Sequence, residues 1–292
     1  MTTAVVHSTR PAADPFTHPK LVAAPAVVDV KAEFVVITPD VARDMLRRNT
    51  HNRPIRQNRV NANVRMMLAG QWDVNGEAVK IAHDGTILDG QHRLLAVVKS
   101  GVTITTLVVT GLPLKAQDTM DGGAKRTAGD VFALRGEHNS AILASVARKV
   151  WLWDNGDKRF SAGESATTPE LNALLDANPS LRRSAEIAVR VYHSFRYIPP
   201  SVVGAAHHLT SRIAADEAVW FFQRLGDGAE LPLRHPVLTL RNRVMTDKDA
   251  KRDVSDGRHM AQVLTAWNAV RDGKTSLAAI KIAADAPAVD PK

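Results

Sequence analysis

Ten consecutive residues, Ile87 to Ala96, combine the end of a strand, a glycine turn and the first turns of an amphipathic helix. The apolar run stops at Asp89, Gly90 permits a tight turn, and the apolar face of the helix starts at Leu94. Because the first N–H groups of a helix lack partners within it and carry partial positive charge, an anion is stabilised beside them. The segment therefore predicts a junction where phosphate binds; the alternative is a capped helix with exposed polar residues.

The polar side chains at this junction extend the phosphate hypothesis. Arg93 can add a charge-assisted, forked pair of hydrogen bonds, and His92 can donate a hydrogen bond or carry a proton. Asp89 can cap the helix, hold a metal ion or accept a proton. These three side chains are therefore candidate residues for binding and for catalysis.

Positive charge is concentrated in one short segment of a chain whose formal net charge is +8. Residues 43–65 contain no lysine, one acid and seven arginines, namely Arg43, Arg47, Arg48, Arg53, Arg56, Arg59 and Arg65. Guanidinium groups bind phosphate in a fork that ammonium groups cannot copy, so this composition favours phosphate contacts. The segment is therefore a candidate DNA-binding surface, and a solvated helix face is the alternative.

The periodicity of apolar residues divides the chain into two halves. In the first half, strands are expected at 34–37, 79–81, 86–88 and 104–109, with helices between them and an Asp-Gly hairpin turn at 84–85. After residue 109 only helical patterns follow, including one that starts with Thr168 as its N-cap. We expect a disordered leader, 1–31; an α+β domain, 32–138; an all-helical domain, 139–285; and a tail, 286–292.

Composition excludes several classes of protein. The chain has no cysteine, which excludes disulfides, thiolate metal sites and a cysteine nucleophile. Its apolar runs contain proline or are far shorter than a bilayer-spanning helix, so we expect a soluble, cytoplasmic protein without membrane contact.

A glycine-containing segment, Asp121 to Thr127, is a second candidate phosphate site. Its successive glycines allow close approach of the backbone to a ligand, and Lys125, Arg126 and Thr127 carry phosphate-binding groups. Asp121 is a candidate ligand for Mg²⁺. The alternative is a flexible turn in which Thr127 caps the next helix.

The pentapeptide Asp89 to Arg93 resembles the signature of DGQHR-domain proteins, a branch of the ParB/sulfiredoxin-like superfamily. The expected order of strands and helices over Glu33 to Val109, roughly a quarter of the chain, is similar to that of ParB-like domains. The segments Asn52-Arg53-Pro54 and Gly123 to Thr127 also resemble those of a set of actinobacterial and phage proteins.

This resemblance implies a ParB/sulfiredoxin-like domain that binds a nucleoside triphosphate, ATP or CTP, with Mg²⁺. It implies that Gly90, Gln91, His92 and Arg93 contact phosphate, that Arg53 and Arg56 close the other side, and that Glu77 acts as a base or orients water. The chain departs from partition ParB proteins in having Gln-His where they have Glu-Arg, and it lacks the cysteine of sulfiredoxin. CTP specificity and thiol chemistry are therefore not carried over.

Three functions are left open at this point. The first is a DNA-associated NTPase or phosphotransferase in DNA modification or in phage or host DNA metabolism, with Glu77, Asp89, His92 and Arg93 as catalytic residues. The second is a non-catalytic DNA-binding regulator, and the third is a nuclease that uses Glu77, Asp89 and His92. In each, DNA contacts Arg43, Arg47, Arg48, Arg59 and Arg65, and the chain is compatible with a homodimer.

Overall fold

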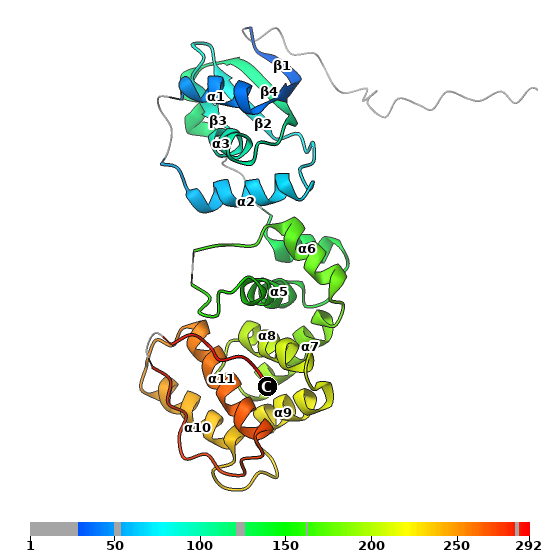
Figure 1. Ribbon diagram of the computed structural model, residues 1–292, viewed down its shortest axis with the longest axis vertical. Helices are drawn as coiled ribbons and strands as arrows, with labels where there is room; N and C mark the ends of the chain where they lie inside the picture. The colour runs from blue at the N-terminus through cyan, green and yellow to red at the C-terminus, as the bar shows by residue number, and fades with distance from the viewer. Residues whose placement is uncertain (1–28, 50–53, 121–125, 162, 284–285) are drawn as a thin grey trace, which may run out of the picture.

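The computed structural model describes residues 29–49, 54–120, 126–161, 163–283 and 286–292. A unit with a β-sheet lies at one end of the molecule and a helical region at the other, and α2 lies between them (Figure 1). The elements of the sheet unit are β1 Lys31–Ile37, α1 Pro39–Arg47, α2 Gln57–Leu68, β2 Ala78–Ala82, β3 Ile87–Asp89, α3 Gln91–Ser100, β4 Ile104–Leu112 and the 3₁₀ helix η1 Leu114–Thr119. The four expected strands are all present.

The sheet is mixed, with the strand order β1-β4-β2-β3. β4 pairs antiparallel with β1 and parallel with β2, and β2 pairs antiparallel with β3. The apolar core of the unit includes Ile37, Val79 and Val108 from the strands and Leu94 and Val97 from α3. This core fixes α3 against the sheet and so places the turn after β3.

Local sequence explains the ends of these elements. Thr38 caps α1 by accepting a hydrogen bond from the Val41 N–H at 3.2 Å. The β2–β3 turn has Gly85 at a φ of 89°, and the Asp84 carboxylate accepts a hydrogen bond from the Thr86 N–H at 2.9 Å. The Asp-Gly hairpin turn predicted from the sequence is therefore confirmed.

The described residues of the second half form helices and the segments that connect or follow them, without a strand. Its helices are α4 Ala128–Leu134, α5 Ser140–Asp154, α6 Thr168–Ala177, α7 Leu181–Ser194, α8 Pro200–Ser211, α9 Ala215–Asp227, α10 Pro236–Asp249 and α11 Asp256–Arg271. They enclose a second apolar core in which Phe132, Phe221 and Trp267 are fully buried. The α+β organisation expected from the sequence is confirmed.

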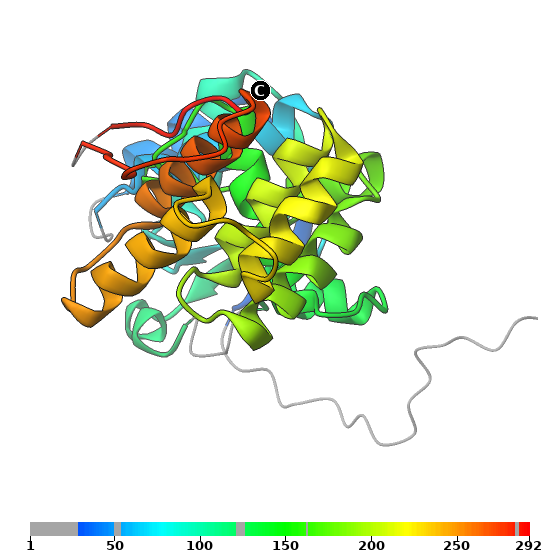
Figure 2. The same ribbon diagram turned by 90° about the horizontal axis from the view of Figure 1, so that it is seen from below.

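At two places the packing differs from the domain boundaries that the sequence predicts. Phe132 of α4 is part of the helical core, so the two cores separate ahead of residue 138. The last residues lie along α11 (Figure 2), where the Trp267 indole N–H donates to the Lys292 carbonyl at 3.0 Å and Ala288 is buried. Residues 286–292, the predicted tail, are therefore anchored to the helical core.

The N-cap of α6 is Thr167 rather than the expected Thr168, because the Thr167 hydroxyl and the Glu170 carboxylate form a reciprocal capping box. The expected leader lies almost entirely outside the described residues, since the description begins at residue 29. In the described residues we find no helix that is both long and apolar enough to cross a bilayer.

Candidate functional site

A cleft of about 510 Å³ opens at the N-terminus of α3, and we call it the α3 cleft. Its walls come from α2, the segment before β2, the turn between β3 and α3, and the start of α6. It is lined by Arg59, Ala62, Asn63, Met66, Gln71, Trp72, Asp73, Asn75, Glu77, Asp89, Gly90, His92, Arg93 and Pro169. The four candidate catalytic residues therefore meet in one cleft, Glu77 from the segment before β2 and the other three from the β3–α3 junction.

Gly90 gives the cleft its helix N-terminus. Its φ is 103°, and a Cβ atom built on it would lie 3.0 Å from a methyl carbon of Val79, so only glycine fits without strain. The Gly90 carbonyl accepts the first helical hydrogen bonds, from the N–H groups of Arg93 and Leu94, at 2.9 and 3.0 Å. Within the described residues no side chain forms a capping hydrogen bond at the start of α3, and the positive end of a helix dipole favours an anion beside it.

Arg93 lines the cleft and also links α3 to the start of β2. Its guanidinium donates to the Glu77 carbonyl at 2.7 Å, to the Ala78 carbonyl at 2.6 Å and to the Asp89 carboxylate at 3.2 Å. A guanidinium has five N–H donors, and these three contacts use three of them. Arg93 ties α3 to β2, and its substitution will disturb the fold together with any phosphate contact.

Gln91 and His92 bind the segment that joins α1 to α2. His92 Nε2 accepts a hydrogen bond from the Arg56 N–H at 3.0 Å, and the Gln91 side-chain oxygen accepts one from the Asn49 amide at 3.2 Å. Both side chains are buried. The Nε2 lone pair of His92 is therefore already used by the Arg56 N–H, whereas the sequence suggested that His92 would donate a hydrogen bond or carry a proton.

Two carboxylates of the site lie in the cleft with different partners. Asp89 is 3.2 Å from the Arg93 guanidinium and 4.0 Å from the Lys80 ammonium. Glu77 is exposed, and the contacts described for it use its backbone: its N–H donates to the Asn75 side chain and its carbonyl accepts from Arg93. Glu77 is thus the carboxylate that is placed to act on a ligand. The described residues contain no group of three or more metal-binding side chains.

The helix α2 contributes a stripe of cleft residues that sequence reasoning missed. Arg59, Ala62, Asn63 and Met66 follow the spacing i, i+3, i+4 and i+7, which places them on one helix face. Arg59 is exposed, and its charge alone places it in the predicted DNA-binding set. The spacing was readable in the sequence, but nothing there showed that this face borders the β3–α3 turn.

Other predicted residues lie elsewhere. Arg53, Asp121 and Lys125 fall outside the described residues, so the proposed Mg²⁺ ligand has no structural description. Arg126 is exposed and does not line the α3 cleft. Thr127 caps α4 in a capping box with Asp130, which matches the alternative stated for this segment.

The arginines of α1 form a separate exposed surface. Arg43 pairs with Asp40, and Arg47 pairs with Asp44 at 3.2 Å, each within the same helix. Arg48 follows the helix and packs against the hairpin turn at Gly85. These side chains remain at the surface, where such pairs contribute about 0–1 kcal/mol and do not prevent contact with a polyanion.

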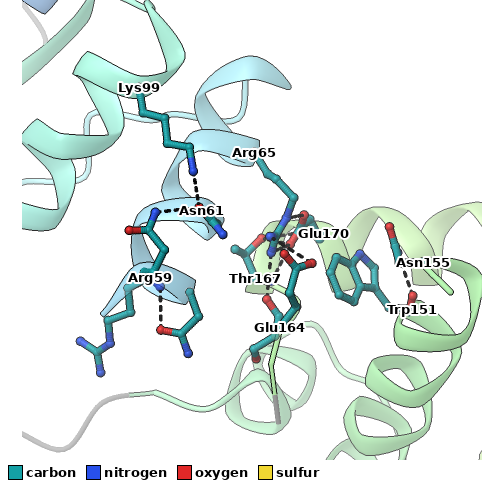
Figure 3. A network of polar contacts seen from close by, with 12 residues as sticks. Arg59, Asn61, Arg65, Lys99, Trp151, Asn155, Glu164, Thr167 and Glu170 are labelled. Carbon is teal, nitrogen blue, oxygen red and sulfur yellow. Dashed lines mark hydrogen bonds and ion pairs between the residues drawn. The ribbon is translucent and has the colours of Figure 1, made fainter. Parts of the chain in front are cut away.

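Arg65 faces the helical region instead of the cleft (Figure 3). Its Nε donates to the Glu170 carboxylate at 2.7 Å, its Nη2 donates to the Ser165 carbonyl at 2.9 Å, and its guanidinium lies 5.1 Å from the centre of the Trp151 ring. Burial alone would raise the pKa of Glu170, but hydrogen bonds from Arg65 and Thr167 outweigh it and lower that pKa. Arg65 therefore joins the two units, and we leave it out of the proposed DNA-binding set.

Comparison with models of protein families, with curated proteins and with solved structures finds no match to this chain. The site is therefore interpreted from its own geometry. It combines a helix N-terminus, an exposed arginine and an exposed carboxylate with an apolar and amide-bearing wall formed by Met66, Trp72 and Asn63. Such a cleft suits a ligand with an anionic end and a larger, partly apolar body.

Proposed function

We propose that this chain is a DNA-associated protein that binds a nucleoside triphosphate, ATP or CTP, in the α3 cleft. The observation that carries the proposal is the meeting of Arg59, Glu77 and Arg93 at the start of α3, whose N-cap residue is Gly90. In this proposal the triphosphate lies against the first turn of α3, between Gly90 and Arg59. The nucleoside fills the wall that contains Met66 and Trp72.

The proposal includes a ParB/sulfiredoxin-like fold for the sheet unit, from β1 to η1, residues 31–119. Its support is the order strand, helix, helix, strand, hairpin, strand, helix and strand, together with the Asp89 to Arg93 signature at the start of α3. The parallel pairing of β2 with β4 is consistent with that arrangement.

Hydrolysis of the nucleotide or transfer of its phosphate would need a divalent cation, and the carboxylates of the cleft are compatible with one. Mg²⁺ is usually held by one or two carboxylates together with phosphate oxygens, and Glu77 and Asp89 both line the cleft. Bound there, Mg²⁺ would neutralise the developing charge on the phosphates. Glu77 would orient the attacking group, while Arg59 and the helix N-terminus would stabilise negative charge.

A non-catalytic regulator is the second candidate function. The observation that favours it is that Asp89 and Arg93 engage each other and the backbone of β2, which leaves fewer groups to act on a phosphate. Nucleotide binding without release of phosphate would identify this function.

Replacing Arg59 with Ala is expected to weaken binding of ATP or CTP about tenfold or more, because it removes a charge-assisted contact at the phosphate end. Arg43→Ala is the matched control, since Arg43 is also exposed on a helix but lies outside the cleft. Isothermal calorimetry with and without Mg²⁺ measures both variants. We choose Arg59 over Arg93 because Arg93 also ties α3 to β2. Equal affinities of the wild type and Arg59→Ala would refute this placement of the phosphates.

If DNA binds across the exposed surface of Arg43, Arg47 and Arg48, the affinity for DNA should fall more than about tenfold between roughly 50 and 200 mM salt. Each phosphate contact adds about one unit to the slope of log affinity against log salt concentration, so Arg43→Ala should lower that slope by about one. Fluorescence anisotropy with labelled duplex DNA measures the slope. An affinity for DNA that does not change with salt concentration would show that DNA does not bind across this surface.

A further inference from the structure

The helix α2 is shared by the α3 cleft and by the junction between the two units. One face carries Arg59 and Asn63, which line the cleft, and Arg65 projects from the same helix toward α6 (Figure 3). The Lys99 ammonium of α3 donates to the Asn61 side chain at 2.8 Å, so α2 is also held to the sheet unit. Movement of α2 therefore changes both the cleft and the junction.

The junction depends strongly on Arg65. Between the described residues of the two units, every side-chain hydrogen bond and ion pair comes from this one guanidinium, which contacts Glu170, Ser165 and, at 3.8 Å, Glu164. The Arg65 side chain is 28% exposed and that of Glu170 is 16% exposed. A pair shielded to this extent is screened less by solvent and salt than a surface pair.

The cleft reaches the helical region at the same place. Pro169 lines the cleft, and the next residue, Glu170, accepts the bond from Arg65. The first turn of α6 is therefore both a wall of the cleft and the anchor of the junction. If α6 moved away from α2, the ion pair would break and the cleft would lose one wall.

We propose that the Arg65–Glu170 pair is a latch that couples occupation of the α3 cleft to docking of the helical region. This inference rests on the proposed function. A ligand that contacts α2 and Pro169 together binds the docked arrangement more tightly than an undocked one, so it favours the latched state. Coupling is reciprocal: the factor by which the ligand favours the docked arrangement is also the factor by which docking strengthens ligand binding. Breaking the latch should therefore weaken ligand binding.

The test compares full-length Arg65→Met and Glu170→Gln, singly and together, with the wild type. Methionine keeps an apolar chain over Trp151, and glutamine keeps a group that can complete the capping box with Thr167. Arg135→Met is the matched control, because Arg135 is 31% exposed and pairs with Asp176 of α6 within the helical region. Circular dichroism and thermal melting confirm that each variant is folded.

Calorimetry with ATP and with CTP, each with Mg²⁺, gives the first readout. We expect each junction variant to bind about tenfold more weakly, the double variant to bind no more weakly than either single one, and Arg135→Met to bind like the wild type. Wild-type affinity in Arg65→Met and Glu170→Gln would overturn the latch while leaving the proposed function intact. Absence of binding by the wild type would overturn the proposed function, and the coupling with it.

Small-angle X-ray scattering gives a readout that does not depend on binding. Without nucleotide, Arg65→Met should have a larger radius of gyration than the wild type and than Arg135→Met, because the two units separate. With saturating nucleotide, the wild type should become more compact, and the variant should respond less. Identical scattering of the wild type and Arg65→Met would show that the pair does not hold the units together.

Discussion

Lowering the pH from about 6.5 to about 4 should remove several kcal/mol from the free energy of unfolding of the helical region, because two buried histidines must take up protons. His207 and His208 of α8 are 3% and 2% exposed. Burial lowers the pKa of each from 6.5 to about 4, with further contributions from His208 on His207 and from Arg212 on His208.

The sign of this pH effect follows from the number of protons that the folded and the unfolded chain bind. Well above pH 6.5 both imidazoles are neutral in the folded and the unfolded chain, and their contribution to stability is complete. As the pH falls toward 4, the unfolded chain binds protons that the folded chain excludes, so stability is lost. The limit is about 3 kcal/mol for each imidazole. His235 and His259, whose pKa values burial also lowers, act in the same direction.

Urea unfolding at a series of pH values measures this loss. His208→Leu should reduce the pH dependence, because it removes a buried imidazole whose Nε2 has no partner among the described residues. His193→Gln is the control, since His193 is exposed at the end of α7 and its substitution should leave the slope unchanged. A free energy of unfolding that stays constant between about pH 6.5 and pH 4.5 would contradict the assignment.

Gly90→Ala should destabilise the protein by about 2–4 kcal/mol and abolish nucleotide binding. The left-handed backbone at φ 103° costs a residue with a Cβ about 1–2 kcal/mol, and the new methyl group would press on Val79 at 3.0 Å. Relief of this contact requires α3 to move away from β2, and that movement displaces the N–H groups at the start of the helix.

The matched control is Gly101→Ala at the other end of α3. Gly101 has a φ of 74°, but a Cβ there meets nothing within 4 Å, so only the backbone strain remains. Thermal or chemical unfolding should therefore show that Gly101→Ala lowers the free energy of unfolding less than Gly90→Ala does. The Gly101→Ala variant should still bind nucleotide. If Gly90→Ala were as stable as the wild type and bound nucleotide normally, the turn would not have the role assigned to it.

Local signals in the sequence predicted the framework of the site. The end of β3, the glycine turn and the start of α3 lie within ten residues. Their conformation therefore depends on residues that are close in the sequence. The hairpin at Gly85 and the helix end at Gly101 are equally local, since both need a positive φ. These elements could be predicted without tertiary information.

Long-range contacts could not be predicted in this way. Arg65 looked like its neighbours in an arginine-rich segment, but its partner Glu170 lies 105 residues away in the sequence. Arg93 was expected to face phosphate, and the oxygens that hold it include two backbone carbonyls of another segment. Backbone acceptors carry no side-chain signature, so no pattern of residue types reveals them.

The most direct test of the central claim is a crystal structure of the full chain grown with Mg²⁺ and a slowly hydrolysed analogue of ATP or of CTP. The account predicts density for the phosphates beside Gly90 at the N-terminus of α3, within hydrogen-bonding distance of Arg59. A nucleotide bound away from the α3 cleft, or no bound nucleotide at saturating concentration, would contradict it.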